Sequence, residues 1–477
     1  KKGIKLKCGT KHQKKIMMKM NRNIVTTVLL SIFISISGFA QDKKWGLEEC
    51  VNYALENNIS IKQTALDTDL ADQDLISAKG NFLPNVNASA SQDWNFGSFI
   101  GQDGNRVSID SRGNSFGLNT GVTLFNGFRN TSIYKQAQLG IESSELQLSI
   151  LKDNISVNVV NQYLNILLNK ENLKVAEEQV AITEKQVIQV SELVDSGVRP
   201  RADLFEVEAQ LASDRERLTN VENSLELAKL ALTQLLQISN EGFDVEEIEL
   251  SLPEVLVEHK SSNEIYDYAL QNRPEIKKAE LDIENSILAI DIAKSAYYPT
   301  LSFGAGLGTS YQHFQGQEDL RVVIDPNDPT NISLVENGFW QQLEDNLGYN
   351  LGFRLDIPIF NRMQTKVSVD KAKINKERIA YSLDQAKQDL RSTIEQAYTD
   401  AKAAFKQFEA SQVSLNAQKE AFKNAQESYN SGVMNSFEFE QVRNRLVNAE
   451  ANLINAKYNF VFTTKVLDFY LGKPLTD

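Results

Sequence analysis

Two acids in this sequence follow similar glycine turns at the same spacing. The tripeptide Ser-Gly-Val occurs at 196–198 and again at 431–433, and an acid, Asp203 or Glu438, stands six residues after each glycine. Carboxylates that line a narrow passage attract cations and repel anions, and their mutual repulsion must be balanced by bases or ions. The alternative interpretation is that each acid only complements the dipole of a helix that begins there, which contributes a few tenths of a kcal/mol.

Residues for catalysis are scarce. Beyond residue 40 the only histidines are His259 and His313, and they are far apart in the chain. No Ser/Cys–His arrangement, glycine-rich phosphate loop or cluster with metal-ligand spacing is visible. The sequence therefore predicts a protein that is not an enzyme and has no catalytic residue, no metal and no cofactor.

Composition and the first residues indicate an exported protein. The 477 residues carry a net charge of −13, which argues against a nucleic-acid partner. Residues 1–40 contain nine Lys/Arg and no acid, then an apolar stretch from Ile24 to Ile36, then Ser37-Gly38-Phe39-Ala40. This pattern predicts a signal peptide that is removed after Ala40. No later run of about 20 apolar residues predicts a transmembrane helix.

The rest of the chain repeats itself. Tyr53–Asn57 recurs as Tyr268–Asn272, at an offset of 215 residues, and 124–126 matches 359–361 at an offset of 235 that persists to Leu232 and Leu467. We therefore divide the chain into a first repeat at 41–238, a linker at 239–262 and a second repeat at 263–477. Each repeat is expected to contain a helix, two strands, a long helix and a return helix, and the second has a longer outer loop.

Changes of period place these elements. Helical spacing over 45–80 and 263–295 ends just before Pro84 and Pro299, which mark helix–strand junctions. Period-two alternation follows, with apolar residues on one face and polar residues or glycine on the other, and it predicts four strands in the chain. Proline-free helical patterns over 127–194 and 362–429 predict helices about 100 Å long. Shorter helices are expected to run back over 202–237 and 437–471.

The strands indicate the environment. Ten tilted residues span about 25 Å, the height of an outer-membrane apolar band, although a soluble sheet with one buried face would show the same alternation. Four strands offer too small a core for helices of this length, which favours the membrane. Open sheet edges are excluded from lipid, so further copies must close the sheet. Three copies would give twelve strands, with two or four copies as rivals.

The expected fold is thus an α+β membrane protein with an internal tandem repeat. It would be a trimeric 12-stranded outer-membrane β-barrel, with four strands from each chain, continued by a long α-helical barrel in the periplasm. The stretch 154–162 supports this because its narrow apolar stripe and many Asn, Gln and Ser suit a helix that is wet on two sides.

Several segments resemble a known family. Tyr297–Leu301, Leu124–Arg129, Ile357–Asn361 and the doubled Ser-Gly-Val turn are similar to the TolC-type outer-membrane efflux proteins. The resemblance implies a homotrimer in outer-membrane lipid, a periplasmic adaptor protein and an inner-membrane transporter. It implies a passive export duct for small molecules. The alternatives are the duct of a type I protein secretion system and, from another class, a secreted helical coiled-coil scaffold.

The resemblance also implies roles for the two glycine turns. Acids at the positions of Asp203 and Glu438 contribute to a closed periplasmic entrance in the family. This sequence departs from the family at Met434, where a basic partner can occur, so Arg199 and Arg201 are expected to supply the positive charge from the other turn.

Contact with the adaptor is expected at the turns themselves. Each glycine should end a helix in the left-handed conformation. The residues expected to contact the adaptor are Gly197, Val198, Gly432, Val433 and Met434. The connections Phe99–Asn114 and Gln312–Asn346 are expected to be loops that face outward.

Overall fold

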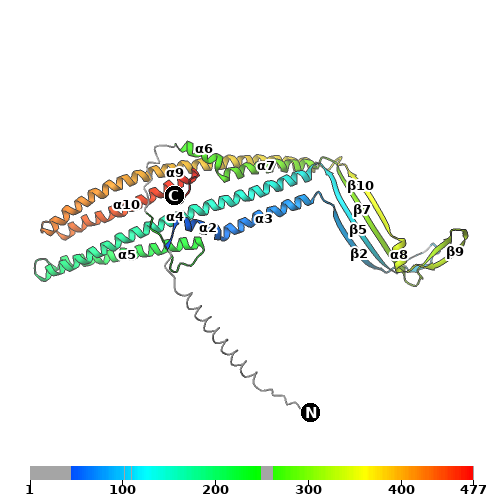
Figure 1. Ribbon diagram of the computed structural model, residues 1–477, viewed down its shortest axis with the longest axis horizontal. Helices are drawn as coiled ribbons and strands as arrows, with labels where there is room; N and C mark the ends of the chain where they lie inside the picture. Colours follow the sequence, from blue (N-terminus) through cyan, green and yellow to red (C-terminus); the bar gives the residue numbers. More distant parts are fainter. Residues whose placement is uncertain (1–43, 101, 109, 249–260, 476–477) are drawn as a thin grey trace, which may run out of the picture.

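The computed structural model describes residues 44–100, 102–108, 110–248 and 261–475. The expected signal peptide and linker residues 249–260, including His259, lie outside the described residues. Helices form one end of an elongated molecule and a four-stranded sheet forms the other (Figure 1). Within the ranges given above, no helix is both long enough and apolar enough to cross a membrane.

Two helices of 67 residues run through most of the helical part. They are α4 (Arg129–Asp195) and α9 (Gln364–Asn430). At about 1.5 Å per residue each is about 100 Å long. The return helices α5 (Arg201–Leu236) and α10 (Ser436–Tyr470) pack against α4 and α9, respectively.

Both long helices begin two residues later than the helical pattern suggests, for a conformational reason. Gly127 and Phe128 have φ of 65°, and at the same place in the second half Arg362 and Met363 have φ of 55° and 64°. Two consecutive left-handed residues turn the chain sharply from strand to helix, and each non-glycine residue held there costs about 1–2 kcal/mol. The repeated strain shows that this sharp turn is imposed by the surrounding structure.

The prediction of a single helix before each pair of strands is wrong, because two helices are present each time. These are α2 (Leu47–Asn57) and α3 (Ile59–Gly80), then α6 (Ser262–Asn272) and α7 (Pro274–Ser295). Asn58 breaks the first pair with an extended backbone, and its side chain caps α3 by accepting from Ser60 N and Ile61 N. Arg273 breaks the second pair because Pro274 disfavours a helical conformation in the residue before it.

The sheet is antiparallel and has the order β10-β7-β5-β2. Its strands are β2 (Asn85–Asn95), β5 (Ser111–Asn126), β7 (Thr300–Phe314) and β10 (Gly348–Asp356). Pro84 and Pro299 stand directly before β2 and β7. The central pair, β5 and β7, joins the two halves of the chain, which leaves one strand from each half at an edge.

The pairing register gives the sheet two chemically different faces. One row across the sheet is Ala88, Leu118, Leu307 and Tyr349. The next row, on the opposite face, is Asn87, Asn119, Gly306 and Asn350. The expected alternation is interrupted near the end of β5, where an irregularity between Thr123 and Phe125 brings Phe125 opposite Leu301.

The connections expected to be outward-facing loops contain regular structure. The first holds the hairpin β3 (Ser98–Ile100) and β4 (Arg106–Ser108). The second holds the hairpin β8 (Leu320–Asp325) and β9 (Asp328–Glu336), followed by α8 (Phe339–Asp345). Both lie at the end of the sheet that is remote from the helices (Figure 1).

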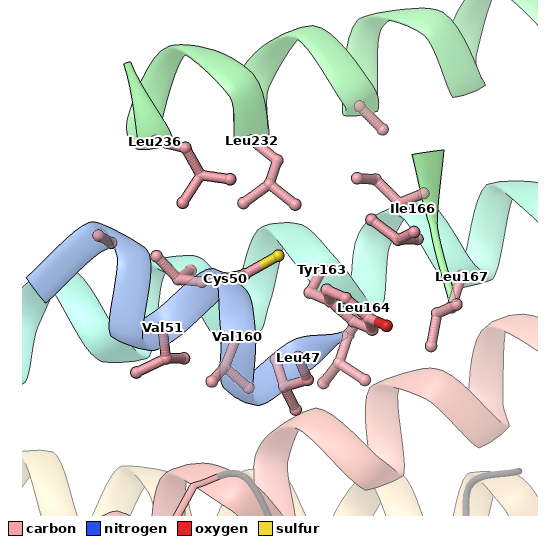
Figure 2. Close-up of a cluster of buried hydrophobic side chains, with 14 of the residues drawn as sticks. Leu47, Cys50, Val51, Val160, Tyr163, Leu164, Ile166, Leu167, Leu232 and Leu236 are labelled. Atoms are coloured by element: carbon pink, nitrogen blue, oxygen red, sulfur yellow. The ribbon is translucent and has the colours of Figure 1, made fainter. Parts of the chain in front are cut away.

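The main apolar core lies midway along the helices, where α2 packs against α4 and α5. Figure 2 shows Leu232 and Leu236 of α5 facing Cys50 of α2 and Tyr163 of α4. A short parallel pair, β1 (Lys44–Trp45) and β6 (Asp244–Val245), covers this core. The Tyr163 hydroxyl lies 3.2 Å from Trp45 O and 2.8 Å from Glu246 O, so it joins the first element to the start of the expected linker.

A second cluster occupies the matching place in the other half. It contains Ile265 and Ala269 of α6, Ile394 and Ala401 of α9, and Leu467 and Leu471 of α10. Each short helix, α2 or α6, therefore packs against its own long helix at mid-length. Beyond these clusters the long helices run on, away from the sheet, to the two glycine turns.

Candidate functional site: the turns at the far ends of the long helices

Two turns lie at the end of the molecule opposite the sheet (Figure 1). One joins α4 to α5 and the other joins α9 to α10. Gly197 and Gly432 have φ of 74° and 76°, the left-handed region that glycine tolerates best. Val198 N donates to Leu193 O and Val433 N donates to Ser428 O, both at 2.9 Å, so each turn closes its helix in the same way.

Arg199 joins the two turns within one chain. Its guanidinium lies over the Tyr429 ring, 4.2 Å from the ring centre, and Nη2 donates to Tyr429 O at 3.3 Å. Nη1 lies 3.4 Å from Asp203 Oδ2. Burial raises the pKa of Tyr429, and the positive charge of Arg199 opposes that rise. One arginine of the first turn thus holds both an acid of its own turn and an aromatic ring of the second.

Met434 has a packing role in this arrangement. Tyr429 stacks on Phe439 with 4.6 Å between ring centres, and Phe422 lies 5.6 Å from Phe439. Met434 packs against this aromatic cluster and is half-buried. Position 434, where a base can occur in the family, thus holds an apolar side chain that packs in this cluster. Arg199 brings a positive charge to the same cluster from the other turn.

The two acids have different surroundings. Asp203 is half-buried beside Arg199, whereas Glu438 is exposed and its backbone N–H donates to the Asn435 side chain at 2.9 Å. Both acids lie in the first turn of a helix, where a negative charge complements the helix dipole. The geometry brings Arg199 to Asp203, while Arg201 is exposed.

A buried charged cluster that was not predicted from the sequence lies near the two glycine turns, on the side toward the sheet. Arg443 of α10 is only 1% exposed. Its guanidinium lies 2.6 Å from Asp214 of α5, 3.0 Å from Gln186 of α4 and 3.4 Å from Glu440. Asp214 also accepts from Thr183 of α4 at 2.6 Å. The cluster therefore ties α10 to the α4–α5 hairpin.

Glu440 is the member of this cluster whose negative charge is least favourably placed. Burial raises its pKa, and the negative charges of Asp214 and Glu206 add to that effect, while Arg443 opposes it. Neither carboxylate oxygen accepts a hydrogen bond of ordinary geometry from the described residues. A signal was present in the sequence, because Glu440 and Arg443 stand among the apolar residues Phe439, Leu446 and Val447 at helical spacing.

The architecture matches known proteins. The family model described as outer membrane efflux protein matches residues 50–236 and 265–473. This chain belongs to that family.

Individual relatives of this outer membrane efflux protein cover most of its length. The outer membrane protein TolC of Escherichia coli K12 is 22% identical over 461 residues, which are 92% of this chain and 85% of TolC. The cation efflux system protein CusC of the same strain is 22% identical over 418 residues, which are 86% of this chain and 82% of CusC.

Solved structures show the same fold. A crystal structure of CusC superposes with a TM-score of 0.75 at 19% identity, covering 92% of this chain and 96% of CusC. The outer membrane channel CmeC of Campylobacter jejuni gives 0.73 at 20% identity, covering 89% and 85%. As an outer membrane efflux protein, this chain is a channel component and not an enzyme, and it lies in the outer membrane and extends into the periplasm.

We expect the buried charge of Arg443 to be essential for stability. Arg443→Ala leaves Asp214 and Glu440 buried without their counter-charge, so it should destabilise the protein by about 3–5 kcal/mol. The measurement is the loss of helical circular dichroism during thermal or denaturant unfolding in detergent. The matched control is Arg445→Ala, which removes an exposed arginine two residues away and should change stability by less than about 0.5 kcal/mol. Equal effects would contradict the role of the cluster.

Glu440→Gln should stabilise the protein increasingly as pH rises. A carboxyl whose pKa is raised in the folded state favours folding below its ordinary pKa of 4.5, and that contribution is lost as pH rises through the folded value. Below 4.5 the protonated glutamate and glutamine are equivalent, so the variant and wild type should unfold at the same temperature. As pH rises above 4.5, the variant should unfold at an increasingly higher temperature than wild type. The control is Glu438→Gln, at an exposed acid, and a gap that is constant with pH would refute the assignment.

Proposed function

We propose that three copies of this chain join edge to edge into a 12-stranded barrel, which the helices continue across the periplasm. In this assembly each chain contributes two similar halves, 41–238 and 263–477. The observation that carries the proposal is a four-stranded sheet with two edge strands, β10 and β2, and an uncovered apolar face. Lipid can cover that face, but only another strand can pair an edge that lies within a membrane.

Exposure along the edge strand supports a lipid-facing surface. Tyr349, Leu351 and Phe353 alternate along β10 and are 83%, 74% and 73% exposed in one chain. The opposite face carries asparagine, serine and glycine, which suit a water-filled lumen. Exposed aromatic residues stand at both ends of the sheet, Trp94 and Tyr349 at one end and Tyr298 and Phe360 at the other. Such aromatic girdles mark the two interfaces of a membrane barrel.

The duct serves efflux driven from the inner membrane. The proposed barrel is a passive passage, so an inner-membrane transporter would supply the driving force through a periplasmic adaptor. The adaptor contact is proposed at the turns, where Val198 and Val433 are 69% and 82% exposed. Exposed apolar side chains at the tip of a structure favour contact with another protein. The cargo proposed is small molecules.

The turns are proposed to form the periplasmic entrance. Three Asp203 and three Glu438 would surround one passage, and Arg199 would hold the closed arrangement through its contacts with Asp203 and Tyr429. Asp203 is the acid whose surroundings fit a closing contact, while Glu438 contributes an exposed negative charge at the mouth. Such a mouth favours the entry of cations.

The proposed function predicts a specific pattern after deletion of the gene. Outer membranes of the wild type should yield an oligomer that resists SDS until it is heated, and the deletion strain should become more sensitive to small toxic compounds. Expression of the intact chain should restore resistance. Recovery of a monomer in the soluble periplasm would support the scaffold alternative, and a defect confined to protein export would support the secretion alternative.

Loosening the entrance should increase current through single channels in planar bilayers. Arg199→Ala removes a partly buried contact of about 1 kcal/mol, which shifts the closed–open ratio roughly five-fold toward open. Asp203→Ala with Glu438→Ala should raise conductance, because Arg199 loses its closing contact with Asp203, or weaken block by multivalent cations, because the negative charge at the mouth is lost. Arg201→Ala, at an exposed arginine of the same turn, is the control. If Arg199→Ala and the double variant both conduct like the wild type, the two acids only complement the helix dipole.

A further inference from the structure

The hairpin formed by β8 and β9, here named the outer hairpin, has one apolar face that the described residues of a single chain leave open. Its cross-strand pairs Val322–Leu334 and Ile324–Ile332 are separated by two residues along each strand, so all four side chains share one face. These side chains are between 54% and 64% exposed. The opposite face contains Arg321, Val323, Ser333 and Val335, and its two valines are each 37% exposed. The face of Val322, Ile324, Ile332 and Leu334 is therefore the more apolar and the more exposed of the two.

Polar contacts hold the base of the outer hairpin in place. Asp319 accepts from the Tyr311 hydroxyl at 3.2 Å and lies 2.9 Å from His313 Nδ1, and both partners belong to β7. Arg321 forms an ion pair of 2.9 Å with Asp345 of α8. These contacts fix where the hairpin leaves the sheet without covering its apolar face. Because a lone two-stranded hairpin is marginally stable in water, that face needs a partner.

The position of the outer hairpin indicates what the partner is. It belongs to the connection between β7 and the edge strand β10. The other edge strand, β2, leads into the hairpin β3–β4, where Phe99 and Ile100 are 53% and 67% exposed. When β10 of one copy pairs with β2 of the next, the outer hairpin and the neighbour's β3–β4 hairpin meet above the same seam.

Charge argues against a lipid surface as the partner. The segment 315–337 carries five acids and a single base, Arg321. Anionic lipid headgroups would repel this segment. The face of the neighbouring β3–β4 hairpin that carries Phe99 and its cross-strand partner Val107 presents apolar area without that repulsion.

We propose that the apolar face of each outer hairpin packs on the β3–β4 hairpin of the neighbouring copy, so that linked hairpins border the outer mouth of the channel. The inference rests on the proposed edge-to-edge assembly. It adds a second contact between copies outside the membrane, made by side chains, whereas the seam within the membrane is made by backbone hydrogen bonds.

Cysteine cross-linking in intact outer membranes tests this contact. The full chain with Leu334→Cys and Phe99→Cys is treated with a short bis-maleimide, denatured and run on a reducing gel. Covalent dimers and trimers are expected. Val322→Cys with Phe99→Cys is a second pair from the same face, and it should behave alike. The control is Ser333→Cys with Phe99→Cys, on the opposite face of the same strand, which should remain monomeric. Of the two natural cysteines, Cys8 belongs to the expected signal peptide, and Cys50 is fully buried and does not report on the surface.

An unheated sample on the same gel separates the two proposals. If SDS-resistant trimers form but neither apolar-face pair links copies, or the Ser333 pair links them equally, the hairpin contact is wrong and the assembly stands. A cross-link within one chain, seen as a monomer of altered mobility, means that the chain covers its own hairpin and also overturns the inference. If the unheated sample contains only monomers, the assembly and the hairpin contact both fail.

Discussion

The backbone groups along the outer sides of β2 and β10 have no partner strand among those described in one chain, and the architecture depends on how they are paired. In water such an edge would be tolerated, but in lipid each unpaired group costs several kcal/mol. Placing the sheet in water is unfavourable as well, because the apolar face extends to the edge at β10 and Leu351 and Phe353 would remain exposed to solvent. In the proposed assembly, association of copies would satisfy the edges and lipid would satisfy the face. Neither partner alone would satisfy both.

The helical part follows a different rule, because its long helices pack against different neighbours along their length. Near the sheet α4 packs against α3 and α7, and farther away it packs against α5 and α10. The short helix α2 lies where these neighbours change, and it completes the core around Tyr163 there. Closer to the turns, the buried charges of Arg443 and Asp214 align α10 with the α4–α5 hairpin. A pair of charges tolerates displacement less well than aliphatic contacts do, so it fixes the register of these helices.

Much of this could be read from the sequence, because the relevant signals are periodic. Alternation over two residues identified the sheet strands and their faces, and uninterrupted helical spacing located α4 and α9 to within two residues. The periodic patterns did not predict breaks that depend on single residues. Asn58 is compatible with a continuous helix, and only the structure shows that its side chain caps the next helix. Pro274, in contrast, was a visible signal that the second helix must break. The contact of Arg199 with Tyr429 joins residues 230 positions apart, and no local pattern predicts such a pairing. The acids of the turns were correctly located at helix starts, yet only the folded chain shows that Asp203 has an arginine beside it and Glu438 is exposed.

The two turns are alike in backbone and unlike in side chains. Arg199 and Met434 occupy equivalent places in the two halves, and so do Val194 and Tyr429, so the cation comes from one half and the ring that it covers comes from the other. The contact is therefore made within a chain and not between chains. In an assembly of several copies, such a contact can break in one copy while it persists in the others. An entrance built this way would widen by one subunit at a time, and its current would step through intermediate levels between shut and fully open.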